Sequence, residues 1–338
     1  MLYDFASAQA ITGVVFEGVK KMSPGIDYGL KLEWGVVAMQ VEDQNRVLNK
    51  RCVEIQKELR EAGFECCMLK GQGNGILYPN PYSRMSGDID MWVRPVDVKK
   101  RKDTRSEVLR FVKEHQKMVD EVRYYHIEYT DKEIPVELHF MPGIMNNPLY
   151  NHRLQQWYRS SMDEQCNHEV SLPDGAGDVA VPTREFNIVF QLAHMMHHFF
   201  DEGVGLRQMM DYYYVLMSST SVATRQCVNE FPLHSLLHRL GLWKFAGAVM
   251  FVMKEVFQLE EKYMIAPVDG RRGETLMEEI LKGGNFGQYS GLTQHGMALK
   301  YFLKIRRNMR FVTQYPAEAL CEPIFRTWHF FWRLAHKN

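Results

Sequence analysis

Apolar positions along the chain recur at helical spacing in some stretches and alternate with polar positions in others. The helical pattern predicts helices over residues 3–22, about 33–62, 96–118 and 151–165. Short alternating or apolar runs predict strands over residues 64–70, 88–95, 122–130 and 134–140. The last two of these strands are expected to form a hairpin through residues 131–133, and a second hairpin is predicted over residues 168–181.

Glycine, proline and capping residues mark the ends of these elements. The break SPGID separates the first two helices, and Ser23 or Asp27 within it is a candidate N-cap. Gly63 is placed where a left-handed residue ends a helix. The glycines of residues 71–75 predict a turn after the first strand.

The order of elements predicts an α+β fold: a small mixed sheet in the middle of the chain, with helices on both sequence sides. From Thr183 onward the sequence consists mainly of long amphipathic helices. We therefore expect an N-terminal helical segment (1–45), an α+β core (46–182) and a helical C-terminal domain (183–338).

Charge and cysteine content narrow the class of protein. The 338 residues hold 41 basic and 41 acidic side chains, a net charge of zero. This balance argues against general binding to a long polyanion, so nucleic acid is not indicated as a partner, although a local phosphate site is compatible with it. Six cysteines without a CxxC pair indicate reduced thiols. The absence of a long apolar run or signal-like N-terminus predicts a cytoplasmic protein without a membrane partner.

The triplet Asp88-Ile89-Asp90 carries the clearest chemical signal. On a strand, Asp88 and Asp90 share one face, whereas Ile89 points to the core. Two carboxylates placed in this way suit Mg²⁺, which prefers oxygen ligands and usually keeps substrate phosphates in its coordination sphere. In IPVELHF, Glu137 and His139 also share one face, so Glu137 can supply a third acid. An isolated pair of aspartates on a solvated edge strand is the alternative interpretation.

The run LKGQGNGILYPNPYSRMSGDIDMWVRP resembles the signature of nucleotidyltransferases with the DNA polymerase β-like fold. More narrowly, it resembles a bacterial family of uncharacterised nucleotidyltransferases whose signature combines LKG, a Tyr-Pro pair, an arginine and a DID strand. The strand VELHF also matches. So does HMMHHFFDEGVGLRQMMDYYYVL (194–216), which resembles the family's His, Leu-Arg and Asp segment. The resemblance is strongest over residues 64–140.

The resemblance implies roles for individual residues. Asp88 and Asp90 match the paired ligands of Mg²⁺ or Mn²⁺, and Glu137 matches a third acid that binds metal or acts as general base. Gly71 matches a glycine at a helix start. The substrate-binding candidates are Lys70, Gly71, Gln72, Arg84, His139 and Arg207, with Gln72 standing where the superfamily usually has serine or glycine.

These features predict a metal-dependent transfer of a nucleoside monophosphate from a nucleoside triphosphate to an acceptor that the sequence does not specify. One alternative is a glycosyltransferase whose DxD motif holds a metal and a sugar nucleotide. Such enzymes normally have a doubly wound nucleotide-binding domain ahead of the DxD motif, which residues 1–63 do not resemble. A second alternative is a non-catalytic interaction module that retains the fold.

Two further clusters have both structural and functional interpretations. His194, His197 and His198 share a helix face and are candidates for a zinc site, for one wall of an active-site cleft that includes Arg207, or for ordinary packing. The basic run of residues 300–310 is a candidate for contact with RNA or an acidic partner, or a solvated helix face.

Overall fold

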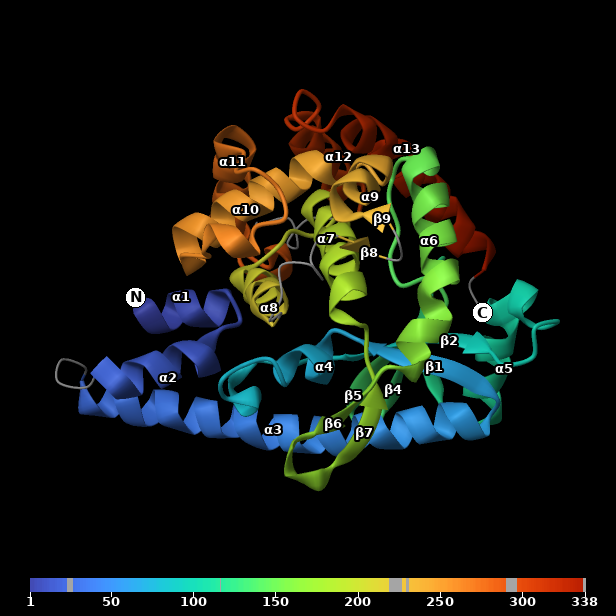
Figure 1. Ribbon diagram of the computed structural model, residues 1–338, viewed down its shortest axis with the longest axis horizontal. Coiled ribbons are helices and arrows are strands. Elements are labelled where there is room, and N and C mark those ends of the chain that lie inside the picture. The colour runs from blue at the N-terminus through green and yellow to red at the C-terminus, as the bar shows by residue number, and fades with distance from the viewer. Residues whose placement is uncertain (23–26, 116, 219–226, 229–230, 290–296, 337–338) are drawn as a thin grey trace. The chain divides into compact units, whose positions relative to one another are not determined.

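A computed structural model describes residues 1–22, 27–115, 117–218, 227–228, 231–289 and 297–336. The chain divides into two compact units (Figure 1). The sheet unit comprises residues 11–142, 161–183 and 332–338. The helical unit comprises residues 1–10, 143–160 and 184–331. The expected domain boundary between residues 45 and 46 falls inside one continuous helix, Tyr28–Glu61.

Helices account for most of the described chain, and the expected α+β class is confirmed. They are α1 (Leu2–Ala8), α2 (Thr12–Met22), α3 (Tyr28–Glu61), α4 (Gly71–Gly75), α5 (Thr104–Glu114), α6 (Pro148–Asn167), α7 (Arg184–Phe200), α8 (Leu206–Met217), α9 (Leu233–Arg239), α10 (Trp243–Phe257), α11 (Gly270–Gly283), α12 (Met297–Met309) and α13 (Pro316–Ala335).

Five strands form the central sheet in the order β1-β2-β5-β4-β3. They are β1 (Phe64–Leu69), β2 (Ile89–Pro95), β3 (Met118–Val122), β4 (His126–Asp131) and β5 (Ile134–His139). β2 and β5 run parallel, whereas the other neighbouring strands run antiparallel, so the sheet is mixed as expected. Two smaller strand pairs are β6 (Glu169–Leu172) with β7 (Gly177–Ala180), and β8 (Cys227–Val228) with β9 (Phe231–Pro232).

One face of the central sheet forms the core of the sheet unit. Side chains from β1, β2, β4 and β5 pack there with α3, α5 and the β6–β7 hairpin; they include Met68, Ile89, Met91, Val136 and Leu138. Because successive strand residues point to opposite faces, this burial directs Asp90, Glu137 and His139 to the other face. The predicted alternation in β2 and β5 is therefore confirmed.

The C-terminal half of the long helix α3 packs against that core through Leu48, Cys52, Ile55 and Leu59. The 34 residues of α3 span about 50 Å at 1.5 Å per residue. Asp27 caps its start by accepting a hydrogen bond from the Leu30 N–H at 3.0 Å, which confirms one of the two N-cap candidates; Ser23 lies outside the described residues. Gly63, with φ of +83°, follows its end as predicted.

Local structure departs from the sequence-based prediction at several points. The glycine-rich residues 71–75 form the short helix α4 instead of a turn. Packing explains this outcome: a Cβ on Gly73 would lie 2.8 Å from the Val181 side chain, so glycine lets the helix approach closely. Residues 96–118 do not form one helix, because α5 covers only 104–114 and the chain enters the edge strand β3 at Met118. β4 also begins at His126, later than predicted.

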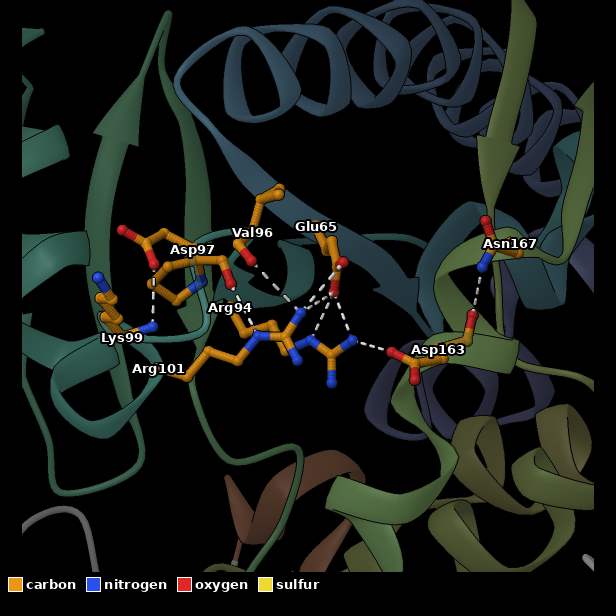
Figure 2. Close-up of polar contacts among 9 residues, drawn as sticks. Glu65, Arg94, Val96, Asp97, Lys99, Arg101, Asp163 and Asn167 are labelled. Atoms are coloured by element: carbon orange, nitrogen blue, oxygen red, sulfur yellow. Dashed lines mark hydrogen bonds and ion pairs between the residues drawn. The ribbon is translucent and has the colours of Figure 1, made fainter.

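A charged network fixes the register of β1 against β2 at the end remote from Asp90 (Figure 2). Glu65 lies directly across from Arg94 and also contacts Arg101 at 3.3 Å. Arg94 in turn pairs with Asp163 near the end of α6. A shift of one residue would break these pairs and turn every side chain of the strand to the other face. The same register places Leu69 across from Asp90.

The helical unit has its own core of aromatic and aliphatic side chains from α7, α8, α10 and the segment before α13. At the start of α13, the buried carboxylate of Glu318 accepts hydrogen bonds from the backbone N–H groups of Asn146 (2.8 Å) and Asn147 (3.1 Å). Burial nevertheless raises the pKa of Glu318 to about 7.

The thiols of Cys52, Cys66, Cys67 and Cys166 are free and buried, and Cys321 is free and partly exposed. The side chain of Cys227 lies outside the described residues. Within the described chain, no single helix is long and apolar enough to cross a membrane; only α9 and α10 taken together, with a 120° bend between them, reach that length and composition.

Candidate active site

Three carboxylates meet on the face of the sheet opposite the core. Asp88 lies one residue before β2, Asp90 lies on β2, and Glu137 lies beside Asp90 on β5. One oxygen from each of the three carboxylates lies within 4.8 Å of the other two. Asp90 is buried, whereas Asp88 and Glu137 are partly exposed, so the cluster opens toward solvent on one side. The structure thus brings together the three acids that the sequence singled out.

Two cationic side chains contact these carboxylates. Lys70 Nζ lies 3.2 Å from Asp90 Oδ2. His139 Nε2 lies 3.0 Å from Asp90 Oδ1 and 3.0 Å from Glu137 Oε2, so it bridges the two strands. Both cations come from positions that the sequence proposed as substrate ligands. In this structure they neutralise part of the acidic charge.

The pKa shifts follow from this arrangement of charges. Burial would raise the pKa of Asp90, but the Lys70 ammonium and the hydrogen bond from His139 hold it well below its usual range. Burial would lower the pKa of His139, but its hydrogen bonds to Asp90 and Glu137 raise it to about 9. Burial alone would also lower the pKa of Lys70, but Asp90, Asp88 and Glu137 raise it. Around neutral pH, Asp90 is therefore ionised while Lys70 and His139 are protonated.

A second histidine, which the sequence analysis did not identify, completes the site. His126 on β4 pairs with His139 across the β4–β5 hairpin, and its Nδ1 lies 3.2 Å from Glu137 Oε2. Burial, reinforced by the positive charges of His139 and Arg123, holds the pKa of His126 well below its ordinary value. The site therefore contains one neutral and one protonated imidazole on either side of Glu137.

The backbone at the end of β1 directs Lys70 toward the acids. Lys70 has φ of +51°, an uncommon conformation for a residue with a side chain, and Gly71 follows with φ of +48°. This turn ends the strand and starts α4. A lysine in such a conformation is found where the surrounding structure requires it. From this turn the Lys70 side chain reaches Asp90, with Nζ 3.2 Å from Oδ2.

Gln72 and Arg84 lie in a buried polar network next to the acids. The Gln72 amide donates to Asn49 Oδ1 at 2.5 Å and accepts a hydrogen bond from the Ser86 hydroxyl at 2.8 Å. Arg84 donates to the same hydroxyl at 2.8 Å, and its backbone carbonyl accepts a hydrogen bond from Asn45. The network fastens α4 and the segment before β2 to α3. Gln72 thus has a structural role whether or not it also contacts a substrate.

Other candidates from the sequence lie in the helical unit. Arg207 lies on α8, where its guanidinium stacks on the Phe286 ring at 5.3 Å. On α7, the Nε2 atoms of His194 and His198 are 3.0 Å apart, while burial lowers the pKa of His197 to about 4. Among the described residues, the groups of three ligands that could hold a metal are His126 with Glu137 and His139, and the Asp88, Asp90 and Glu137 cluster.

The basic run 300–310 forms most of α12, and several of its cations contact acids of the same unit. Lys304 pairs with Asp201 at 2.7 Å, whereas Arg307 and Arg310 both contact Glu279. These ion pairs favour the structural interpretation of this run over an RNA-binding surface. The side chain of Lys300 lies outside the described residues.

Comparison with known proteins gives the chain its family. A model of the uncharacterised nucleotidyltransferase family matches residues 1–258. Among solved structures, an antigenic nucleotidyltransferase-like protein from Paracoccidioides brasiliensis is similar at 11% sequence identity, with a TM-score of 0.39, over 67% of this chain and 96% of that one. No curated protein matches the chain. Because the family model covers most of the chain, including every residue of the acidic site, the protein belongs to the uncharacterised nucleotidyltransferase family.

Proposed function

We propose that the protein is a metal-dependent nucleotidyltransferase that moves a nucleoside monophosphate from a nucleoside triphosphate to an acceptor hydroxyl or phosphate. The observation that carries the proposal is the convergence of Asp88, Asp90 and Glu137 within 4.8 Å. The DNA polymerase β-like signature around LKG and DID, described from the sequence, supports the same reaction.

The donor set of this cluster fits Mg²⁺ or Mn²⁺. All three side chains offer carboxylate oxygens, the ligands that these hard cations prefer, and two are partly exposed and thus accessible from solvent. When bound, the metal would neutralise negative charge on the phosphates and on the developing alkoxide. Lys70 and His139 already contact the same carboxylates, so a cation has to compete with them or displace them.

In the proposed reaction, an acceptor oxygen forms a bond to the α-phosphorus while the bond from that phosphorus to the pyrophosphate oxygen breaks. The acceptor proton passes to a base, and Glu137 is the candidate because its carboxylate is 20% exposed beside the buried Asp90. Lys70 and Arg84 are the candidate phosphate ligands, since both are cationic and lie on segments that flank the acids. Gly71, Gln72 and His139 are proposed to shape the substrate site.

The proposal predicts nucleotide binding that requires a divalent metal. We would measure thermal unfolding of the full chain with each nucleoside triphosphate, with and without Mg²⁺ or Mn²⁺. A ligand at 100 times its Kd adds about 2.7 kcal/mol to the unfolding free energy. The stabilisation should require both nucleotide and metal, and Asp88→Asn should abolish it.

A matched control is Glu128→Gln, since Glu128 is a partly buried acid directly across from Glu137 on β4 but is not a member of the cluster. This variant should keep the metal-dependent shift. A wild-type protein without any shift, or an Asp88→Asn variant with an unchanged one, would contradict the proposal. No shift with any ligand would favour the non-catalytic module. A shift with sugar nucleotides alone would favour a glycosyltransferase, although the antiparallel β1–β2 pair differs from a doubly wound sheet.

A further inference from the structure

His126 lies beside the proposed Mg²⁺ site, with its Nδ1 3.2 Å from Glu137 Oε2. Its imidazole is 2% exposed, Nε2 has no hydrogen-bond partner among the described residues, and the 3.2 Å approach of Nδ1 to Glu137 Oε2 lacks hydrogen-bond geometry. Buried nitrogens of this kind are rare because losing water without a replacement partner costs free energy. They indicate a ligand that is not part of the polypeptide.

The two imidazoles and Glu137 have the spacing of metal ligands. One nitrogen from each imidazole and one Glu137 oxygen all lie within 4.8 Å of one another. Glu137 Oε2 is 3.2 Å from His126 Nδ1 and 3.0 Å from His139 Nε2. Ligand bonds of about 2.1 Å give ligand-to-ligand separations of about 3.0 Å at octahedral and 3.4 Å at tetrahedral angles. The observed separations therefore match two edges of a coordination polyhedron.

We propose that His126, His139 and Glu137 bind a second divalent ion, a transition metal of the Zn²⁺ class, next to the carboxylate site. Two imidazoles and one carboxylate favour such an ion over Mg²⁺, whereas Asp88, Asp90 and Glu137 offer oxygen alone. Glu137 belongs to both ligand groups and would bridge the two ions. The strand pairing of His126 with His139 holds both rings in place without any metal. This second site does not depend on the nucleotidyltransferase reaction.

The histidines of α7 are another place where Zn²⁺ could bind. The test therefore has to distinguish binding at α7 from binding at His126, His139 and Glu137. The Nε2 atoms of His194 and His198 approach to 3.0 Å. The Glu202 carboxylate lies 3.7 Å from the opposite nitrogen of His198, so it does not complete a set of three converging ligands. The His126 site has three.

The experiment measures Zn²⁺ binding by the full chain in the absence of nucleotide, using chelator-treated protein and titration calorimetry. His126→Gln should weaken binding by about 100-fold or more, since even loss of an outer-shell partner costs 10- to 100-fold. His194→Gln is the matched control and should leave this affinity unchanged. Asp88→Asn should also retain it. Visible absorption of the Co²⁺-loaded wild type should show nitrogen coordination that disappears in His126→Gln.

Thermal unfolding of metal-free His126→Gln checks that the variant folds. If His126→Gln does not fold, the Co²⁺ spectrum of the wild type can still be compared with that of His194→Gln. That comparison tests whether the ion binds at the α7 histidines. The proposal is overturned if His126→Gln binds Zn²⁺ as tightly as the wild type, if His194→Gln abolishes binding or the Co²⁺ spectrum, or if the wild type takes up no Zn²⁺. Loss of the nucleotide shift in Asp88→Asn with Zn²⁺ binding intact would show that the two sites are separable.

Discussion

Replacing Lys70 with methionine removes one charge from the acidic site while keeping an unbranched side chain of similar length. The ammonium lies 3.2 Å from Asp90 Oδ2, and the two side chains are 19% and 3% exposed. At an effective dielectric constant of about 20, this distance corresponds to an attraction of roughly 5 kcal/mol. Desolvation of the lysine offsets part of this attraction, whereas Asp90, which keeps its contact with His139, retains its own desolvation cost. We therefore expect the variant to lose about 3 kcal/mol of unfolding free energy.

Urea unfolding of the wild type, Lys70→Met, Asp90→Asn and the double variant measures this coupling. The double variant should lose less than the sum of the two single variants, because each single change already removes the contact between Lys70 and Asp90. Lys70→Met should also bind Mg²⁺ more tightly in the absence of nucleotide, since lysine and metal compete for the same carboxylates. A loss below 1 kcal/mol in the single variant, or additive losses in the double, would refute the assigned role of Lys70.

Two further predictions concern the scaffold. Protonated Glu318 stabilises the fold below its unfolded pKa of 4.5, and this contribution is lost as pH rises through its folded pKa of about 7. In urea unfolding between pH 5 and 8, the wild type should therefore lose about 2.5 kcal/mol of unfolding free energy relative to Glu318→Gln. Parallel pH profiles of the two proteins would contradict this prediction. Gly13→Ala would place a Cβ 2.3 Å from the Ser83 carbonyl oxygen. Gly13→Ala should lower the unfolding free energy by about 2 kcal/mol. Gly18→Ala on the same helix, where a Cβ would have nothing within 4 Å, should raise it by up to about 1 kcal/mol. Equal melting temperatures for these two variants would disprove the close contact at Gly13.

The alternation of polar and apolar residues along β2 and β5 was enough to predict which face of each strand carries the acids. In each short strand the apolar residues all lie on one face, which is the buried one. It could not show that Lys70 and His139 neutralise Asp90, since those contacts depend on distances between strands. His126 was missed because the predicted three-residue turn at 131–133 would pair it with Leu138. The structure has a two-residue turn, which pairs Asp131 with Ile134 and so His126 with His139. The helical state of residues 71–75 depends on packing against Val181, which glycine content alone does not reveal.

The division of the chain between its two units has a consequence for the order in which they can form during synthesis. The polypeptide passes from one unit to the other five times. All four residues around Glu137 and the last member of the core, Val181, are made before residue 184. By contrast, the side chain of Gln9 can form its hydrogen bonds with Leu206 and Ile280, both at 2.9 Å, only after those residues have been synthesised. The acidic site can therefore assemble on the ribosome while the segments of the helical unit still lack most of their partners. For the same reason, no single truncation of the chain yields either unit whole.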